Sequence, residues 1–149
     1  EVSWVPSYGP EMRGGTAYCT VVVSDQPIGS PVIKNPSHLV AMNRPSLEKF
    51  SGTIKPGGLI FINGSLISVR SGRDDVRELI VPVIEIARDL GTVKAANVVA
   101  LAAFVAKSDI VRIASLKASV AEEFASREKL ISLNMKAIEE GVKAAGGSE

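Results

Sequence analysis

The chain has 149 residues, of which 17 are Lys or Arg and 16 are Asp or Glu, so its formal net charge at pH 7 is +1. This balance gives no field that would attract nucleic acid or an anionic membrane, and an aromatic content of 5% leaves few rings for stacking bases. We therefore expect a single domain over residues 1–149, with no nucleic-acid partner and no membrane partner.

Cysteine and histidine each occur once, as Cys19 and His38. Zinc and iron–sulfur sites need several such ligands, so any redox centre must come from another chain. Cys19 lies in the apolar run Ala17–Val23 and is predicted to be a small buried residue. The sequence shows no signal peptide and no apolar stretch of membrane-spanning length, so we expect a cytoplasmic location.

The chain opens with a predicted strand, Val2–Val5, and with Glu1 in place of methionine, so we expect it to be cut at its front. The next segment, Pro6–Gly15, holds three glycines and two prolines and is predicted to be a loop. Arg13 beside Gly14 and Gly15 could hold a phosphate or a carboxylate. The alternative is a tight turn with a solvated arginine, which loop chemistry alone favours because short glycine motifs arise by chance.

A strand over Ala17–Ser24 is predicted from its β-branched residues, and we expect 28–33 to return beside it as a hairpin. The run His38–Met42 predicts a strand buried on both faces. A helix is predicted to follow, with Asn43 or Arg44 as its cap and Pro45 in its first turn.

Pro56–Gly58 breaks the chain before Leu59–Asn63, another predicted buried strand. An exposed connection over 65–75 leads to the apolar run 79–83, to a helix over 84–90 closed by Gly91, and to a central helix over 95–105. Two amphipathic helices are predicted after Lys107. Strands separated by helices indicate an α/β fold: a largely parallel sheet flanked by helices, with a hairpin insertion and a helical C-terminus.

The last two helices carry two acid-first pairs four residues apart, Glu123 with Arg127 and Glu139 with Lys143, which we expect to be surface pairs. The apolar residues of this region pack either against this domain or against a partner. They are Leu130, Leu133, Ala137 and Val142.

Few residues are candidates for chemistry. Asp74 and Asp75 are neighbours whose side chains would diverge on a regular element, and His38 is predicted to be a core or strand-end residue. Asn43 and Asn63 follow predicted strands, where ligands collect in open α/β sheets, but cap and turn roles fit both. No group of these residues forms a complete active site, so we do not expect this chain to be an enzyme by itself.

The run Pro6–Cys19 resembles the gamma subunit of 2-oxoacid:ferredoxin oxidoreductases, which is related to a domain of pyruvate:ferredoxin oxidoreductase. The similarity continues in order to about residue 105, through Ile28–Pro31, Ala41–Asn43, Pro45–Phe50, Lys55–Gly58, Pro82–Gly91, Ala96–Asn97 and Val99–Leu101. The form Pro-Ser-Tyr-Gly-Pro-Glu-Met is most similar to the 2-oxoisovalerate and 2-oxoglutarate branches. Family members begin with a strand and a Gly-Gly-Gln-Gly loop, a segment that the resemblance implies is missing here.

The resemblance implies a subunit of an enzyme that oxidatively decarboxylates a 2-oxoacid to acyl-coenzyme A. Thiamine diphosphate, magnesium and iron–sulfur clusters are then expected on the alpha, beta and possibly delta subunits, with ferredoxin as electron acceptor. The resemblance further implies that the opening loop helps form the coenzyme A side of the site or a subunit interface, with Arg13 facing a phosphate. The implied residues are Ser7, Tyr8, Gly9, Glu11, Arg13, Gly14 and Gly15.

Two other functions stay open from the sequence. One is a stand-alone α/β module that binds an anion or a nucleotide on the glycine loop. The other is a purely architectural subunit whose loop only packs against its neighbours.

Overall fold

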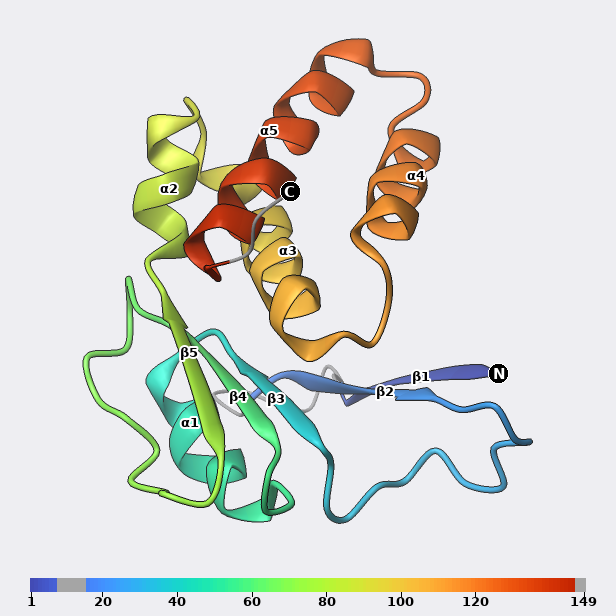
Figure 1. The fold of residues 1–149 in the computed structure, drawn as a ribbon, viewed down its shortest axis with the longest axis vertical. Helices are drawn as coiled ribbons and strands as arrows, with labels where there is room; N and C mark the ends of the chain where they lie inside the picture. The colour runs from blue at the N-terminus through green and yellow to red at the C-terminus, as the bar shows by residue number, and fades with distance from the viewer. Residues whose placement is uncertain (8–15, 147–149) are drawn as a thin grey trace. The chain divides into compact units, whose positions relative to one another are not determined.

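A computed structural model describes residues 1–7 and 16–146 (Figure 1). By its internal contacts the chain divides into two compact units, Glu1–Pro36 and Ser37–Glu149, which we describe separately. The expectation of a single domain over residues 1–149 stays a prediction.

The first unit is built on two antiparallel strands, β1 (Val2–Ser7) and β2 (Tyr18–Val23). Val2 pairs with Val23 at one end and Ser7 pairs with Tyr18 at the other. The predicted hairpin of Ala17–Ser24 with residues 28–33 is wrong, because β2 pairs with β1 and residues 24–37 contain no strand. Gly29, Ser30 and Pro31 within 28–33 favour turn and irregular backbone, whereas β1 offers six residues in register.

Cys19 in this ribbon is exposed, so its predicted burial is wrong. A two-stranded ribbon has no second layer of its own, and residues on its outward face therefore keep contact with water. The apolar run around Cys19 gave no information about which face would be covered.

The second unit contains a parallel sheet in the order β3 (His38–Ala41), β4 (Leu59–Asn63) and β5 (Arg77–Val81). The predicted parallel sheet and the predicted buried strand Leu59–Asn63 are confirmed, since every residue of β4 is buried. The prediction that His38–Met42 is buried on both faces is wrong. The strand lies at the sheet edge with β4 as its one neighbour, and Val40 is 41% exposed.

Short helices and turns connect the strands. Asn43 caps α1 (Arg44–Phe50) by accepting from the Ser46 N–H at 2.9 Å, and a proline occupies the first turn, as predicted. A 3₁₀ turn, η1 (Ser51–Thr53), follows. The predicted chain breaks at Gly57 and Gly91 are confirmed, because these glycines adopt positive φ angles of 75° and 98°.

Alternate residues of the strands enter two cores. On one face, Ile60 and Ile62 pack with Leu47 of α1 and with Ile54 and Ile67. On the other face, Leu59, Phe61 and Val81 pack beneath the remaining helices. These are α2 (Val83–Asp89), α3 (Ala96–Ser108), α4 (Ile113–Glu123) and α5 (Glu128–Ala144), with a 3₁₀ turn η2 (Val93–Ala95) ahead of α3.

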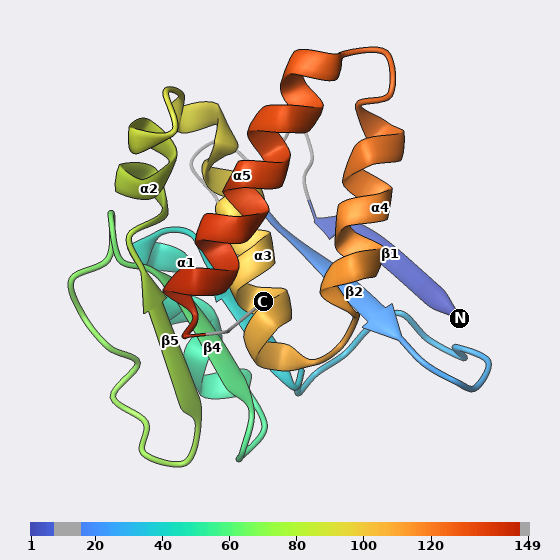
Figure 2. The same cartoon turned by 45° about the horizontal axis from the view of Figure 1, so that its top comes forward.

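Helix α3 is central, as predicted, and α5 runs alongside it (Figure 2). Gly141 of α5 permits this approach, because an added Cβ would lie 2.5 Å from the Val99 carbonyl oxygen and 2.8 Å from the Ala102 Cβ. Ala137 and Val142 of the same helix are buried. The C-terminal helices therefore complete the core of their own unit.

The predicted surface pairs on these helices are wrong. Helix α4 ends at Glu123, so Arg127 does not lie one turn further along the same helix. Among the described residues, Lys117 of α4 reaches Glu139 at 3.9 Å, and Lys143 reaches Glu140 at 3.7 Å. The packing of α4 beside α5 brings Lys117 to Glu139, a relation that spacing along one helix cannot reveal.

Candidate functional site

The glycine-rich segment connects the two strands of the ribbon. Ser7, the last residue of β1, pairs with Tyr18, the first residue of β2, and this rung brackets the segment. Of the seven predicted site residues, the structure describes only Ser7, which is half-buried. The other six lie outside the described residues: Tyr8, Gly9, Glu11, Arg13, Gly14 and Gly15. Their predicted role stays a prediction.

The carboxyl ends of the parallel strands form a second place where ligands could be expected. Asn63 is 1% exposed there, and its Nδ2 donates to the Met42 carbonyl at 3.1 Å. Its Oδ1 accepts from the Ser65 N–H at 3.1 Å. Both amide ends are thus used within the fold, so the cap and turn roles expected of Asn43 and Asn63 are confirmed.

Ser65 and Glu85 meet at the same edge of the sheet. The Ser65 hydroxyl donates to Glu85 Oε2 and accepts from the Ile84 N–H at 2.9 Å. The hydrogen bond from Ser65, aided by backbone bonding, lowers the pKa of Glu85. Sequence reasoning missed this pair, because it treated residues 65–75 as an undifferentiated connection. The sequence did contain a signal for it. Ser65 lies just past the end of β4, and Glu85 lies in the first turn of α2.

His38 lies at the first position of β3, as expected of a strand-end histidine. Its ring meets the Phe104 ring edge to face, with centroids 5.7 Å apart. Burial, with a smaller contribution from the positive charge of Arg77, lowers the pKa of His38, which favours the neutral ring. These surroundings hold the imidazole as a packing residue.

Asp74 and Asp75 do not act as a pair. Asp75 accepts from Arg73 Nε at 2.8 Å, and this bond lowers the pKa of the Asp75 carboxyl. The same guanidinium donates through one nitrogen to the carbonyls of Ser51 at 2.9 Å and Ile54 at 2.6 Å. Arg73 therefore fastens the 65–76 connection to the end of α1 and has a structural role.

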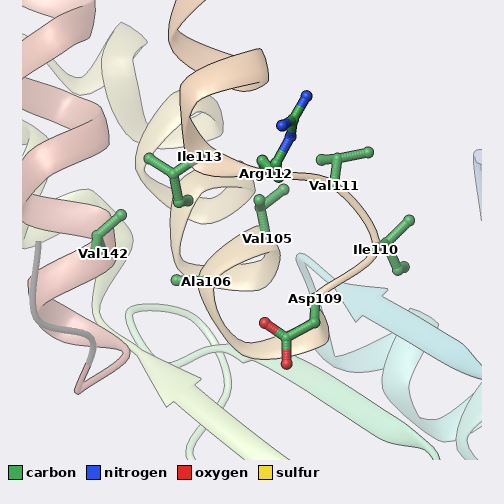
Figure 3. A pocket seen from close by; sticks show the side chains of 8 residues that line it. All are labelled: Val105, Ala106, Asp109, Ile110, Val111, Arg112, Ile113 and Val142. Carbon is green, nitrogen blue, oxygen red and sulfur yellow. The ribbon is translucent and has the colours of Figure 1, made fainter.

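A hollow of about 390 Å³ opens where the α3–α4 connection passes α5 (Figure 3). Six of its eight lining residues have apolar side chains, Val105, Ile113 and Val142 among them. In Figure 3 the side chains of Asp109 and Arg112 point away from each other, so the hollow presents no converging polar groups.

Residues 1–7 and 16–146 contain neither a cluster of metal ligands nor a membrane-spanning helix. Within these ranges, no three His, Cys, Asp or Glu residues are grouped so that they could hold a metal ion. None of the helices there has the length and apolar character needed to cross a membrane.

The family model for pyruvate ferredoxin/flavodoxin oxidoreductase matches residues 1–144. The chain belongs to this family. Ketoisovalerate oxidoreductase subunit VorA of Methanothermobacter thermautotrophicus is 40% identical over 142 residues, covering 95% of this chain and 29% of that protein. The 2-oxoglutarate synthase subunit KorC of Methanocaldococcus jannaschii is 33% identical over 116 residues, covering 76% of this chain and 62% of that protein.

Solved structures show the same fold. The keto/oxoacid ferredoxin oxidoreductase gamma subunit from Geobacter sulfurreducens aligns with a TM-score of 0.78 and 30% identity, covering 97% of this chain and 80% of that one. A 2-oxoglutarate:ferredoxin oxidoreductase from Magnetococcus marinus, solved with 2-oxoglutarate, coenzyme A and succinyl-CoA, aligns with a TM-score of 0.83 at 22% identity. The match covers 97% of this chain and 26% of that one.

These matches confirm the gamma-type resemblance and the α/β fold class predicted from the sequence. The chain spans 29% of the length of the ketoisovalerate relative.

Proposed function

We propose that this chain forms part of a 2-oxoacid:ferredoxin oxidoreductase, which converts a 2-oxoacid and coenzyme A to acyl-coenzyme A and carbon dioxide while reducing ferredoxin. The observation that carries this proposal is the family match over residues 1–144. The relatives named above support it, because they are subunits of ketoisovalerate and 2-oxoglutarate enzymes. We also propose that the redox cofactors reside on the other subunits of the complex, namely thiamine diphosphate with magnesium and the iron–sulfur clusters.

The chain's own contribution to the reaction is the segment between β1 and β2. In this proposal Ser7 and the following residues to Gly15 help form the coenzyme A side of the site, with Arg13 bonding a phosphate through its planar fork. The Ser7–Tyr18 rung supports the assignment, because it gives the segment a fixed base of paired backbone. The relative solved with coenzyme A bound is consistent with such a site.

The substrate is a branched or dicarboxylic 2-oxoacid in this proposal, following the relatives that act on ketoisovalerate and 2-oxoglutarate. Assays of the assembled complex with pyruvate, 2-oxoglutarate, 2-oxoisovalerate and indolepyruvate identify it. The proposal expects turnover with 2-oxoisovalerate or 2-oxoglutarate, measured as ferredoxin reduction that depends on coenzyme A, and turnover with pyruvate or indolepyruvate alone would contradict it.

Arg13→Ala in the co-expressed complex tests the role of the loop. Loss of a charge-assisted bond to phosphate is expected to raise KM for coenzyme A roughly tenfold or more, with a smaller effect on KM for the 2-oxoacid. Arg127→Ala is the matched control, since Arg127 is an exposed arginine just ahead of α5. Unchanged coenzyme A kinetics together with an unchanged complex on size exclusion would rule out the assignment of Arg13.

A further inference from the structure

The two faces of the β1–β2 ribbon differ in how far their side chains are exposed to solvent. One face, here called the apolar face, consists of Val2, Trp4, Pro6, Cys19, Val21 and Val23, which lie opposite one another in the register. All six residues are exposed, with Trp4 at 63% and Val2 at 70%. On the opposite face, Ser3, Ser7, Thr20 and Val22 are half-buried, while Val5 and Tyr18 are exposed to a smaller extent, at 38% and 42%.

Among the described residues of its own unit, none forms a second layer over the apolar face. Neither hydrophobic core includes a described residue from Glu1–Pro36. A two-stranded ribbon is marginally stable in water without a layer against its apolar side, and an exposed tryptophan among valines is the composition of an interface centre. A further polypeptide surface on this face would stabilise both the ribbon and the contact.

We propose that the apolar face docks on an uncharged, apolar surface of another polypeptide region of the same oxidoreductase. This inference rests on the proposed function. None of the six side chains carries a charge, so a charged partner surface would be desolvated without compensation. In the ketoisovalerate relative the matched region is 29% of the protein, so further polypeptide adjoins this fold there.

The position of the face adds a second reason for a partner within the complex. The face begins at the outer end of the ribbon, at Val2 and Val23, and runs to Pro6 and Cys19, one rung before Ser7 and Tyr18. Those two residues bracket the segment proposed to contact coenzyme A. Docking through the apolar face would therefore hold the base of that segment against the subunit that carries the reacting groups.

The chain carries a built-in probe of this face. Cys19 is its one cysteine, and its neighbour across the ribbon is Pro6. Because Cys19 is exposed, we expect iodoacetamide to label it in the isolated chain. In the co-expressed complex its labelling is expected to slow by about tenfold or more, followed by mass spectrometry of its peptide.

Adjacent residues of β2 provide matched variants. Val21→Lys places a charge on the apolar face, and Thr20→Lys places the same charge on the opposite face. We expect Val21→Lys to weaken association with the other subunits by about tenfold or more, while Thr20→Lys associates like the wild type. Circular dichroism checks that both variants fold, and the Cys19 labelling of the wild type needs no variant.

The outcomes separate the two proposals. A wild-type chain that forms no complex overturns the proposed function. A complex in which Cys19 keeps its full reactivity, or in which both lysine variants bind alike, overturns only the docking proposal. If the isolated chain is a dimer and Val21→Lys dissociates it, the apolar face binds a second copy of the chain. If the isolated chain is a monomer in which Cys19 is already protected from labelling, the rest of this chain covers the face. Either of these also overturns the proposal.

Discussion

The Asn63 side chain joins the ends of two neighbouring strands, because its Nδ2 donates to the Met42 carbonyl across the edge of the sheet. Its Oδ1 accepts from the Ser65 N–H, which begins the turn after β4. One buried amide thus fixes both the end of β3 and the start of the next connection.

We expect Asn63→Ala to lower the free energy of unfolding by about 1–3 kcal/mol, since it leaves the Met42 carbonyl and the Ser65 N–H without these partners in a buried place. Urea unfolding followed by circular dichroism measures the change. Asn97→Ala is the control, because Asn97 is exposed on α3 and its Oδ1 accepts from the adjacent Val98 N–H, its one hydrogen bond to a described residue. Equal stability losses in the two variants would contradict the bridging role of Asn63.

Gly141→Ala is expected to destabilise the chain by about 1–3 kcal/mol, because the new methyl group would push α5 away from the α3 backbone. Gly52→Ala provides the comparison, since a Cβ there meets nothing within 4 Å. Thermal unfolding of both variants should show a lower Tm for the first and little change for the second. A tolerated alanine at 141 would show that the two helices separate at little cost.

The Ser65 and Glu85 pair predicts a pH dependence. Because the pKa of Glu85 is lowered from its ordinary 4.5, the carboxylate contributes stability above that pH, and the contribution is lost as the pH falls through the folded-state pKa. Ser65→Ala removes the main cause, so the pKa of Glu85 should return toward 4.5. An NMR titration of the Glu85 carboxyl carbon measures it in both proteins.

Glu85→Gln is the control for the pH dependence of stability. Its amide oxygen can still accept from the Ser65 hydroxyl, but the side chain has no group that titrates near pH 4.5. The loss in free energy of unfolding between neutral pH and a pH below 4.5 should be smaller for Glu85→Gln than for the wild type. Identical Glu85 titrations with and without the Ser65 hydroxyl would refute the pairing.

Local signals predicted local structure well. The run Leu59–Ile62 is apolar throughout and, together with Asn63, forms the central strand β4. Asn43 followed by Pro45 predicted the start of α1 at Arg44. In such cases propensity, capping and periodicity are set within a few residues, so the sequence alone was sufficient.

Relations between distant segments were the ones that failed. Cys19 and Val40 were expected inside because their neighbours are apolar, yet a ribbon face and a sheet edge left them exposed. Glu139 was expected to pair with Lys143 on the same helix, but it forms an ion pair with Lys117 of α4. Of the candidate site, the sequence named the segment after Ser7, but it could not show that Glu85 would meet Ser65, since that contact depends on how two strands and a helix align.

The Ser7–Tyr18 rung has a consequence for engineering specificity. Because backbone pairing joins Ser7 to Tyr18 at the two ends of the intervening segment, we expect that the segment can be exchanged between relatives. Chimaeras that carry the corresponding stretch of a ketoisovalerate or a 2-oxoglutarate relative would keep the same anchor. Such transplants would separate what the segment itself contributes to ligand choice from what the remaining polypeptide imposes.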